Sequence, residues 1–250
     1  IRERIDHLRY ETQHDVRGSR IVADELVARF YENRQFQPVW QEPARLDALV
    51  AVIADLVDDG LDPAHYHLDS LQSYRLDRRM GTPLTPQDRA DLDLVATDAF
   101  MLAAYHLYLG SVDPRQLSPQ WNFSERPIEI ERGLAALSDR LAAGQIRETL
   151  DAARPKHVWY QRGRERIREY RALAAEGGWP TLPDGPTLKP GMADPRVPKM
   201  RARLQVTNDF PAPAVAAQAE ASGASQPAAG ADGTATGTPP EDVYDAGLEA

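Results

Sequence analysis

The chain has 250 residues, of which 42% are hydrophobic and 27% charged, so it is long enough for one or two domains with a sizeable core. Its formal net charge of -9 disfavours a general attraction to nucleic acid or anionic lipid. Because the sequence contains no cysteine, these residues form no disulfide, thiolate metal site or cysteine nucleophile.

The first 18 residues are a polar lead-in without an initiating Met or an apolar signal core, which suggests a fragment or a processed form. No run of about 18 apolar residues occurs, so we expect no membrane span in this segment.

Helical periodicity begins after residue 18. One helical face in residues 19–33 carries the apolar side chains Val22, Leu26, Val27 and Phe30. The strongest pattern lies in residues 42–60, where Pro43 suits the first turn and Gly60 suits the end. Its apolar stripe consists of Leu46, Leu49, Val50, Ile53, Leu56 and Val57.

Two capped starts and a long helix follow. Asp62, before a proline, and Asp69, before a serine, suit N-cap positions. In residues 84–110, Thr85 suits the cap, a proline follows it, and Gly110 suits the end. Because this segment is apolar on more than one face, we predict that it forms the central, most buried helix.

Two more helices are predicted before residue 180. One ends at Gly144 and carries a stripe of Ile130, Leu134, Leu137 and Leu141. The other spans the basic segment 155–177 and ends at Gly177. No segment shows sustained strand alternation, so the predicted fold class is all-α, with an irregular helical domain followed by a partial small helical module.

The C-terminal part is rich in proline, glycine and alanine. Six prolines between residues 176 and 204 restrict the backbone to extended and turn forms, which indicates a semi-rigid connection. Residues 211–240 have no aromatic residue and one branched aliphatic residue, Val215, so they cannot bury enough apolar surface to offset the entropy of ordering. We predict a flexible insertion there, and the opening of a further helix in residues 241–250.

Two polar clusters could bind metal ions. His65 and His67 are two residues apart, which on a helix turns their rings away from each other, so local loop packing is favoured over joint ligation. The acid-rich segment 55–69 does not follow the calcium-loop register, so a helix end and N-caps are favoured.

Aromatic and basic residues could bind glycan or nucleic acid. The basic segment 154–171 could form such a surface, but a solvated helix face with pairs such as Glu165–Arg168 and Arg166–Glu169 is favoured. The tryptophans could stack on sugars, although filling of helix junctions is favoured. The four tryptophans are Trp40, Trp121, Trp159 and Trp179.

No nucleophile elbow, phosphate-binding loop, dinucleotide fingerprint or zinc-protease motif occurs. The sequence therefore predicts no catalytic residue, no metal ligand and no cofactor, and it leaves substrate-binding residues unassigned.

Four passages, in order, resemble the large murein L,D-transpeptidases, also called the YcbB-like group. They are "FYENRQFQPVW", "DDGLDPAHYHLDSL", "AYHLYLGSVDP" followed by Trp121, and "EGGWPTLPDGPTLKPGMADPRV". The similarity covers residues from about 20 to 206.

The resemblance implies a domain plan. It places a scaffold domain at 19–178, a connection at 179–191, and a partial peptidoglycan-binding module at 192–250 that contains the insertion 211–240. "VPKMRARLQV" resembles the first helix of that module, and "VYDAGLEA" resembles the start of its second helix. The family's catalytic domain, with its cysteine and histidine, would lie beyond residue 250, so no catalytic residue is transferred here.

The resemblance also implies a function. The expected function is the non-catalytic scaffold and peptidoglycan-binding portion of a periplasmic L,D-transpeptidase, which cross-links stem peptides during cell-wall biogenesis. The expected partners are peptidoglycan and the family's catalytic domain, with no nucleic acid. Two alternatives stay open: a self-contained helical cell-envelope binding or adaptor protein without enzymatic activity, and a nucleic-acid-associated helical regulator that uses residues 154–171.

Overall fold

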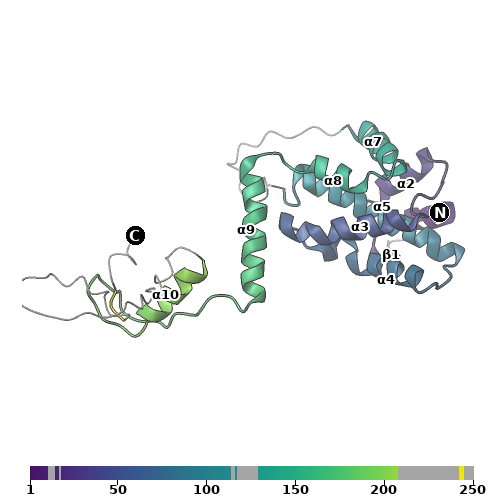
Figure 1. Cartoon of the computed structure of the whole chain (residues 1–250). Coiled ribbons are helices and arrows are strands. Elements are labelled where there is room, and N and C mark those ends of the chain that lie inside the picture. The colour runs from purple at the N-terminus through teal and green to yellow at the C-terminus, as the bar shows by residue number, and fades with distance from the viewer. Residues whose placement is uncertain (11–14, 17, 114–115, 117–128, 208–241, 245–250) are drawn as a thin grey trace, which may run out of the picture. The chain divides into compact units, whose positions relative to one another are not determined.

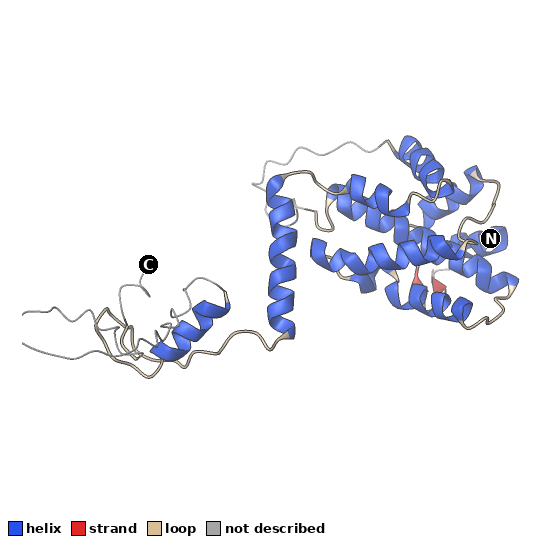
Figure 2. Ribbon diagram, viewed as in Figure 1, coloured by secondary structure: helices blue, strands red, loops and turns tan. Residues whose placement is uncertain are grey.

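The computed structural model describes residues 1–10, 15–16, 18–113, 116, 129–207 and 242–244, which are mostly helical (Figure 2). The helices are α1 (Arg2–Tyr10), α2 (Asp24–Asn33), α3 (Pro43–Ala54), α4 (Leu68–Arg79), α5 (Pro86–Leu109), α7 (Ile130–Ala142), α8 (Ile146–Ala153), α9 (Val158–Ala175) and α10 (Val197–Val206). Two 3-10 turns, η1 (Asp55–Asp59) and η2 (Pro63–Tyr66), and a short antiparallel pair, β1 (Asp15–Val16) with β2 (Ser19–Arg20), complete the described elements. The predicted all-α fold class is confirmed.

The chain divides into two compact units, Ile1–Arg168 and Glu169–Ala250. The division falls within α9, N-terminal to the domain boundary at residue 178 that the sequence suggests. The predicted insertion 211–240 lies outside the described residues, as does Trp121.

Helix α5 is the centre of the first unit. It contacts α2, α3, α4, α8 and η2, and Figure 1 shows it beside α3 and α8. Among the described residues it is the one helix long and apolar enough to cross a membrane, yet 72% of its most apolar window is buried inside the protein. This burial confirms the prediction of a central core helix.

Both ends of α5 follow the local rules read from the sequence. The Thr85 hydroxyl accepts a hydrogen bond from the Asp88 N–H at 3.1 Å, and the Asp88 carboxylate accepts one from the Thr85 N–H at 3.1 Å. Pro86, which has no N–H to leave unpaired, occupies the first turn. At the other end Gly110 adopts a φ of 101°, which a residue with a side chain rarely adopts.

A buried polar network on α5 fixes the connection between α2 and α3. The Asp93 carboxylate accepts hydrogen bonds from the Val39 N–H at 2.6 Å and the Tyr31 hydroxyl at 3.0 Å. The indole of Trp40 is fully buried and donates to the Thr97 hydroxyl at 2.9 Å. Trp40 therefore fills a helix junction, as the sequence predicts.

Several predicted helix boundaries are wrong. Val22 is 57% exposed and precedes α2; its N–H donates to the Asp98 carboxylate, so it is not part of the apolar face. Asp62 caps η2 by accepting from the Ala64 N–H, but Asp69 caps nothing, because α4 begins one residue before it. Gly60 ends η1 rather than α3.

The polar lead-in also contains structure that the sequence reading missed. Residues 2–10 form α1, and the side chains of Ile5 and Leu8 are buried in the core. In α7, the predicted stripe is partly correct, since Leu134 and Leu141 are buried while Ile130 is 46% exposed.

Among its described residues, the second unit contains the C-terminal part of α9, the helix α10 and connecting loops. Trp179 packs edge-on against Tyr170, with ring centroids 5.8 Å apart, and the Arg203 guanidinium lies 5.3 Å from the Trp179 ring centre. Residues 242–244 were expected to open a helix, but instead Val243 pairs in a β-bridge with Ala193. The rest of that expected helix lies outside the described residues.

The contrast between two tryptophans tests this packing. Truncation of the fully buried Trp40 to Ala should lower the free energy of unfolding by about 3–5 kcal/mol, because it leaves a cavity and removes the hydrogen bond that the indole donates to the Thr97 hydroxyl. Trp159, which is 67% exposed, supplies the control, and Trp159→Ala should change stability by less than about 0.5 kcal/mol. Urea titration followed by circular dichroism measures both, and equal losses would contradict this assignment.

Candidate binding groove

A groove opens between α3, α4 and α5 in the first unit, with a volume of about 640 Å³. This size falls in the range of small-ligand pockets, about 300–1,000 Å³. The lining residues are Trp40, Gln41, Pro43, Leu46, Asp47, Arg75, Arg78, Arg79, Gly81, Thr82, Leu84, Arg89, Leu92 and Asp93.

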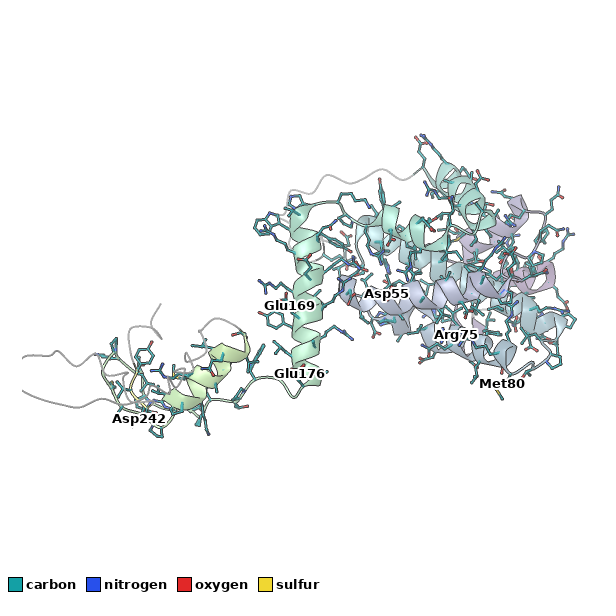
Figure 3. All side chains as sticks on the ribbon, viewed as in Figure 1. Asp55, Arg75, Met80, Glu169, Glu176 and Asp242 are labelled. Atoms are coloured by element: carbon teal, nitrogen blue, oxygen red, sulfur yellow. The ribbon has the colours of Figure 1, made fainter. Side chains whose placement is uncertain are left out.

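Arginines dominate the polar part of the groove. Arg75, Arg78 and Arg79 lie three and four residues apart near the end of α4, so they share one helix face; Figure 3 labels Arg75 there. Arg89 lies near the start of α5. Two separate helices therefore bring four guanidinium groups to one groove.

Arg78 has a structural role. One of its terminal nitrogens donates to the Trp40 carbonyl at 3.0 Å, and the other donates to the Gln41 carbonyl. These bonds join α4 to the start of the segment that leads into α3. They also leave the positive charge of Arg78 without a carboxylate partner in these contacts.

Arg75 and Arg79 share one carboxylate. Asp47 of α3 accepts a hydrogen bond from Arg79 at 3.2 Å and lies 3.9 Å from the Arg75 Nε. The Asp47 side chain is 44% exposed, so water screens both contacts. One carboxylate therefore faces two guanidinium groups.

Arg89 differs from the other three arginines. It is exposed, and within the described part of the chain its guanidinium has no hydrogen-bond or ion-pair partner. Its charge is available to a ligand.

The floor of the groove is apolar and belongs to the core. Trp40, Leu46 and Leu92 are each at most 2% exposed, and Leu84 is half-buried beside them. Asp93 also reaches this floor; burial raises its pKa, while the N–H groups of Val39 and Trp40 act in the opposite direction. Because the Asp93 oxygens already accept bonds from Val39, Trp40 and Tyr31, they are engaged by the fold rather than by a ligand.

The groove therefore carries more positive than negative groups, four arginines against two aspartates, on a chain with a net charge of -9. Guanidinium groups bind carboxylates and phosphates through paired hydrogen bonds. The arrangement suits a compact anionic ligand that also presents apolar surface.

The two histidines considered as metal ligands lie in different environments. His67 Nε2 lies 2.6 Å from the Asp98 carboxylate, and His65 is exposed. Tyr66, between them, is buried with its hydroxyl 2.8 Å from His106 Nδ1. Burial, helped by the charge of Asp59, raises the pKa of Tyr66 to about 12, so its hydroxyl stays protonated.

No metal site emerges in the described ranges. Within them no group of three or more His, Cys, Asp or Glu side chains could hold a metal ion.

The acid-rich and basic segments bind each other, a contact that the sequence reading missed. The Asp59 side chain is fully buried and contacts Arg154 Nη2 at 2.9 Å, Arg164 Nε at 2.7 Å and the Tyr160 hydroxyl at 2.8 Å. The favoured interpretation of these acids as helix ends and caps is therefore incomplete.

The neighbouring acids extend this contact. Asp58 pairs with Arg168 at 2.6 Å and Asp55 pairs with Arg147 at 2.9 Å; Figure 3 labels Asp55 at the end of α3. The basic segment is thus neither a fully solvated face nor a free cationic surface.

The remaining tryptophans differ from the expected junction role. Trp159 is 67% exposed, with the Arg162 guanidinium 5.3 Å from its ring centre. Trp179 is 40% exposed although it contacts Tyr170. Junction filling is therefore wrong for Trp159 and partly correct for Trp179.

The groove arginines were not identified from the sequence, although a signal existed. The helical spacing of Arg75, Arg78 and Arg79 places three cations on one face. Their meeting with Arg89 depends on how α4 packs against α5, which no local pattern reveals.

A change at Asp59 tests the buried ion pairs. Asp59→Asn removes the buried carboxylate and leaves the nearly buried Arg154 with only the half-exposed Asp151 as an ion-pair partner, so it should lower the free energy of unfolding by about 3–5 kcal/mol. Asp55→Asn is the matched control, because both members of its pair with Arg147 are about half exposed, and it should cost less than about 1 kcal/mol. Chemical denaturation of the three proteins gives both values, and a small effect at Asp59 would show that the cluster contributes little.

Comparison with known proteins identifies the family. The Scaffold domain family matches residues 25–167, which run from α2 into α9 and make up more than half of the chain. No curated protein and no solved structure matches the chain. The matched span contains the central helix α5, the buried Asp59 cluster and the whole lining of the groove, so the chain belongs to the Scaffold domain family.

Proposed function

We propose that this chain is the non-catalytic scaffold and peptidoglycan-binding portion of a murein L,D-transpeptidase in the periplasm. The observation that carries the proposal is the membership in the Scaffold domain family over residues 25–167, the region that holds most of the transpeptidase-like passages. A scaffold role means that the helical unit supports neighbouring parts and binding surfaces rather than performing chemistry.

The residues of those passages have architectural roles, as expected of a scaffold. Trp40 of "FYENRQFQPVW" is fully buried beneath the groove. Tyr66 of "DDGLDPAHYHLDSL" is buried and bonded to His106, and Gly110 of "AYHLYLGSVDP" ends the central helix. These positions hold the fold together, which supports a resemblance through the scaffold rather than through an active site.

The charge distribution also supports the proposal. Peptidoglycan stem peptides carry carboxylates, and the groove offers cations on an otherwise acidic protein. Arg154, Arg164 and Arg168 are engaged by aspartates, which leaves the segment 154–171 less suited to nucleic acid.

Sedimentation with purified sacculi tests peptidoglycan binding. The chain should co-sediment with sacculi, and the bound fraction should fall as salt rises, because charge attraction contributes. DNA at the same mass concentration as the sacculi serves as the comparison, and the chain should not bind to it. Retention by DNA without retention by sacculi would favour the nucleic-acid alternative.

The absence of transpeptidase chemistry in these residues is tested separately. The chain contains no cysteine, and an acyl-enzyme requires an activated nucleophile. Incubation with a tetrapeptide donor should give neither a covalent adduct nor released D-Ala by mass spectrometry. An adduct would overturn the non-catalytic assignment.

A further inference from the structure

We propose that the groove between α3, α4 and α5 binds an extended acidic segment of a partner protein, with two carboxylate side chains flanking an apolar one. This proposal does not require that the chain bind peptidoglycan, but the acidic segment and stem-peptide carboxylates would compete for the groove cations. It rests on the availability of the guanidinium groups, on the groove's apolar floor and on charge complementarity.

The first step concerns Arg89. The start of α5 is already capped by Thr85 and Asp88, so its helix end needs no further anion. Arg89 lies just after this cap, and within the described residues its guanidinium has no hydrogen-bond or ion-pair partner. A carboxylate from outside could pair with this guanidinium through charge-assisted hydrogen bonds.

The second step concerns the opposite wall. Arg75 and Arg79 share Asp47, and the Arg79 side chain is 63% exposed. A second carboxylate could therefore bind this pair without displacing Asp47. The groove thus offers two positions for an anion, one on α4 and one on α5. At each position, the protein's own carboxylates balance the arginine charge only in part or not at all.

The third step concerns the space between these positions. Leu46, Leu92 and Trp40 form a buried base, and the apolar side chains that a ligand can reach there are the half-buried Leu84 and the exposed Pro43. An apolar side chain between two carboxylates would contact Leu84 and Pro43 and bury apolar surface there. The sequence pattern that fits these positions is an apolar residue between two acidic residues, in a peptide with an extended backbone.

The fourth step distinguishes a short acidic segment from a polyanion. A long nucleic acid or an anionic lipid surface would extend beyond the groove and meet a protein with a net charge of -9. A peptide confined to a groove of about 640 Å³ gains the local attraction and avoids the wider repulsion.

The experiment uses a short fluorescein-labelled peptide with the central sequence Glu-Leu-Asp and measures its binding to the whole chain by fluorescence anisotropy. Its neutral counterpart has Gln-Leu-Asn. The test variant is Arg89→Gln, and the matched control is Arg132→Gln, which removes an 85% exposed arginine on α7, away from the groove lining. Circular dichroism and thermal melting check that both variants are folded.

We expect the acidic peptide to bind and the neutral peptide to bind much more weakly. Arg89→Gln should raise the Kd of the acidic peptide about tenfold or more, because a charge-assisted hydrogen bond is lost, whereas Arg132→Gln should leave it within about twofold. Arg79→Gln should weaken binding in the same direction as Arg89→Gln.

Two outcomes would overturn the assignment. The first is equal affinity for the acidic and neutral peptides, or equal affinity of the wild type and Arg89→Gln. The second is a muramyl tripeptide that binds at Arg89 more tightly than the acidic peptide, since the groove would then serve peptidoglycan. Sacculus binding is measured on the same variants to keep this result separate from the proposed function. If sacculus binding is intact and the acidic peptide does not bind, only the assignment of a peptide ligand to the groove is refuted.

Discussion

The first unit depends on the pairing of buried carboxylates on its central helix, α5. A carboxylate in the core is unfavourable unless hydrogen-bond donors fill its lone pairs, and buried backbone N–H groups equally need acceptors. In α5, Asp93 accepts from Val39 and Trp40, and Asp98 accepts from Ala23 at 2.7 Å. Two aspartates thus fix both the entry into α2 and the connection that follows it.

This pairing also determines the character of the groove. Its floor consists of Trp40 and neighbouring core residues that the α5 network holds in place. Its walls consist of long arginine side chains, of which Arg78 is held by backbone carbonyls and Arg89 is not held. The fixed floor is preorganised for binding, whereas the adjustable arginine walls accommodate ligands of different shape but must be ordered when a ligand binds.

Local rules predicted the helix ends and the central helix, and they did not predict contacts between distant segments. Thr85, Pro86 and Gly110 act through neighbours a few residues away, so their roles follow from the sequence. The bonds of Asp59 to Arg154 and Arg164 join segments about a hundred positions apart, and such partners depend on tertiary packing.

The groove was missed for the same reason, because Arg89 meets the α4 arginines only after α4 and α5 pack. Helix α1 was missed because its overall polarity concealed Ile5 and Leu8.

The buried Asp59 cluster has a consequence for the order of folding. The carboxylate belongs to the turn after α3, but its cationic partners come from residues 154–164, near the end of the first unit. While the chain emerges during synthesis, this acidic turn stays hydrated and lacks these partners until those residues arrive. Closing such a long loop has an entropic cost and slows the final step. Residues 154–164, which are synthesised last in this unit, therefore complete the packing around the turn that follows α3. Without them, the N-terminal half would remain an open, solvent-accessible intermediate.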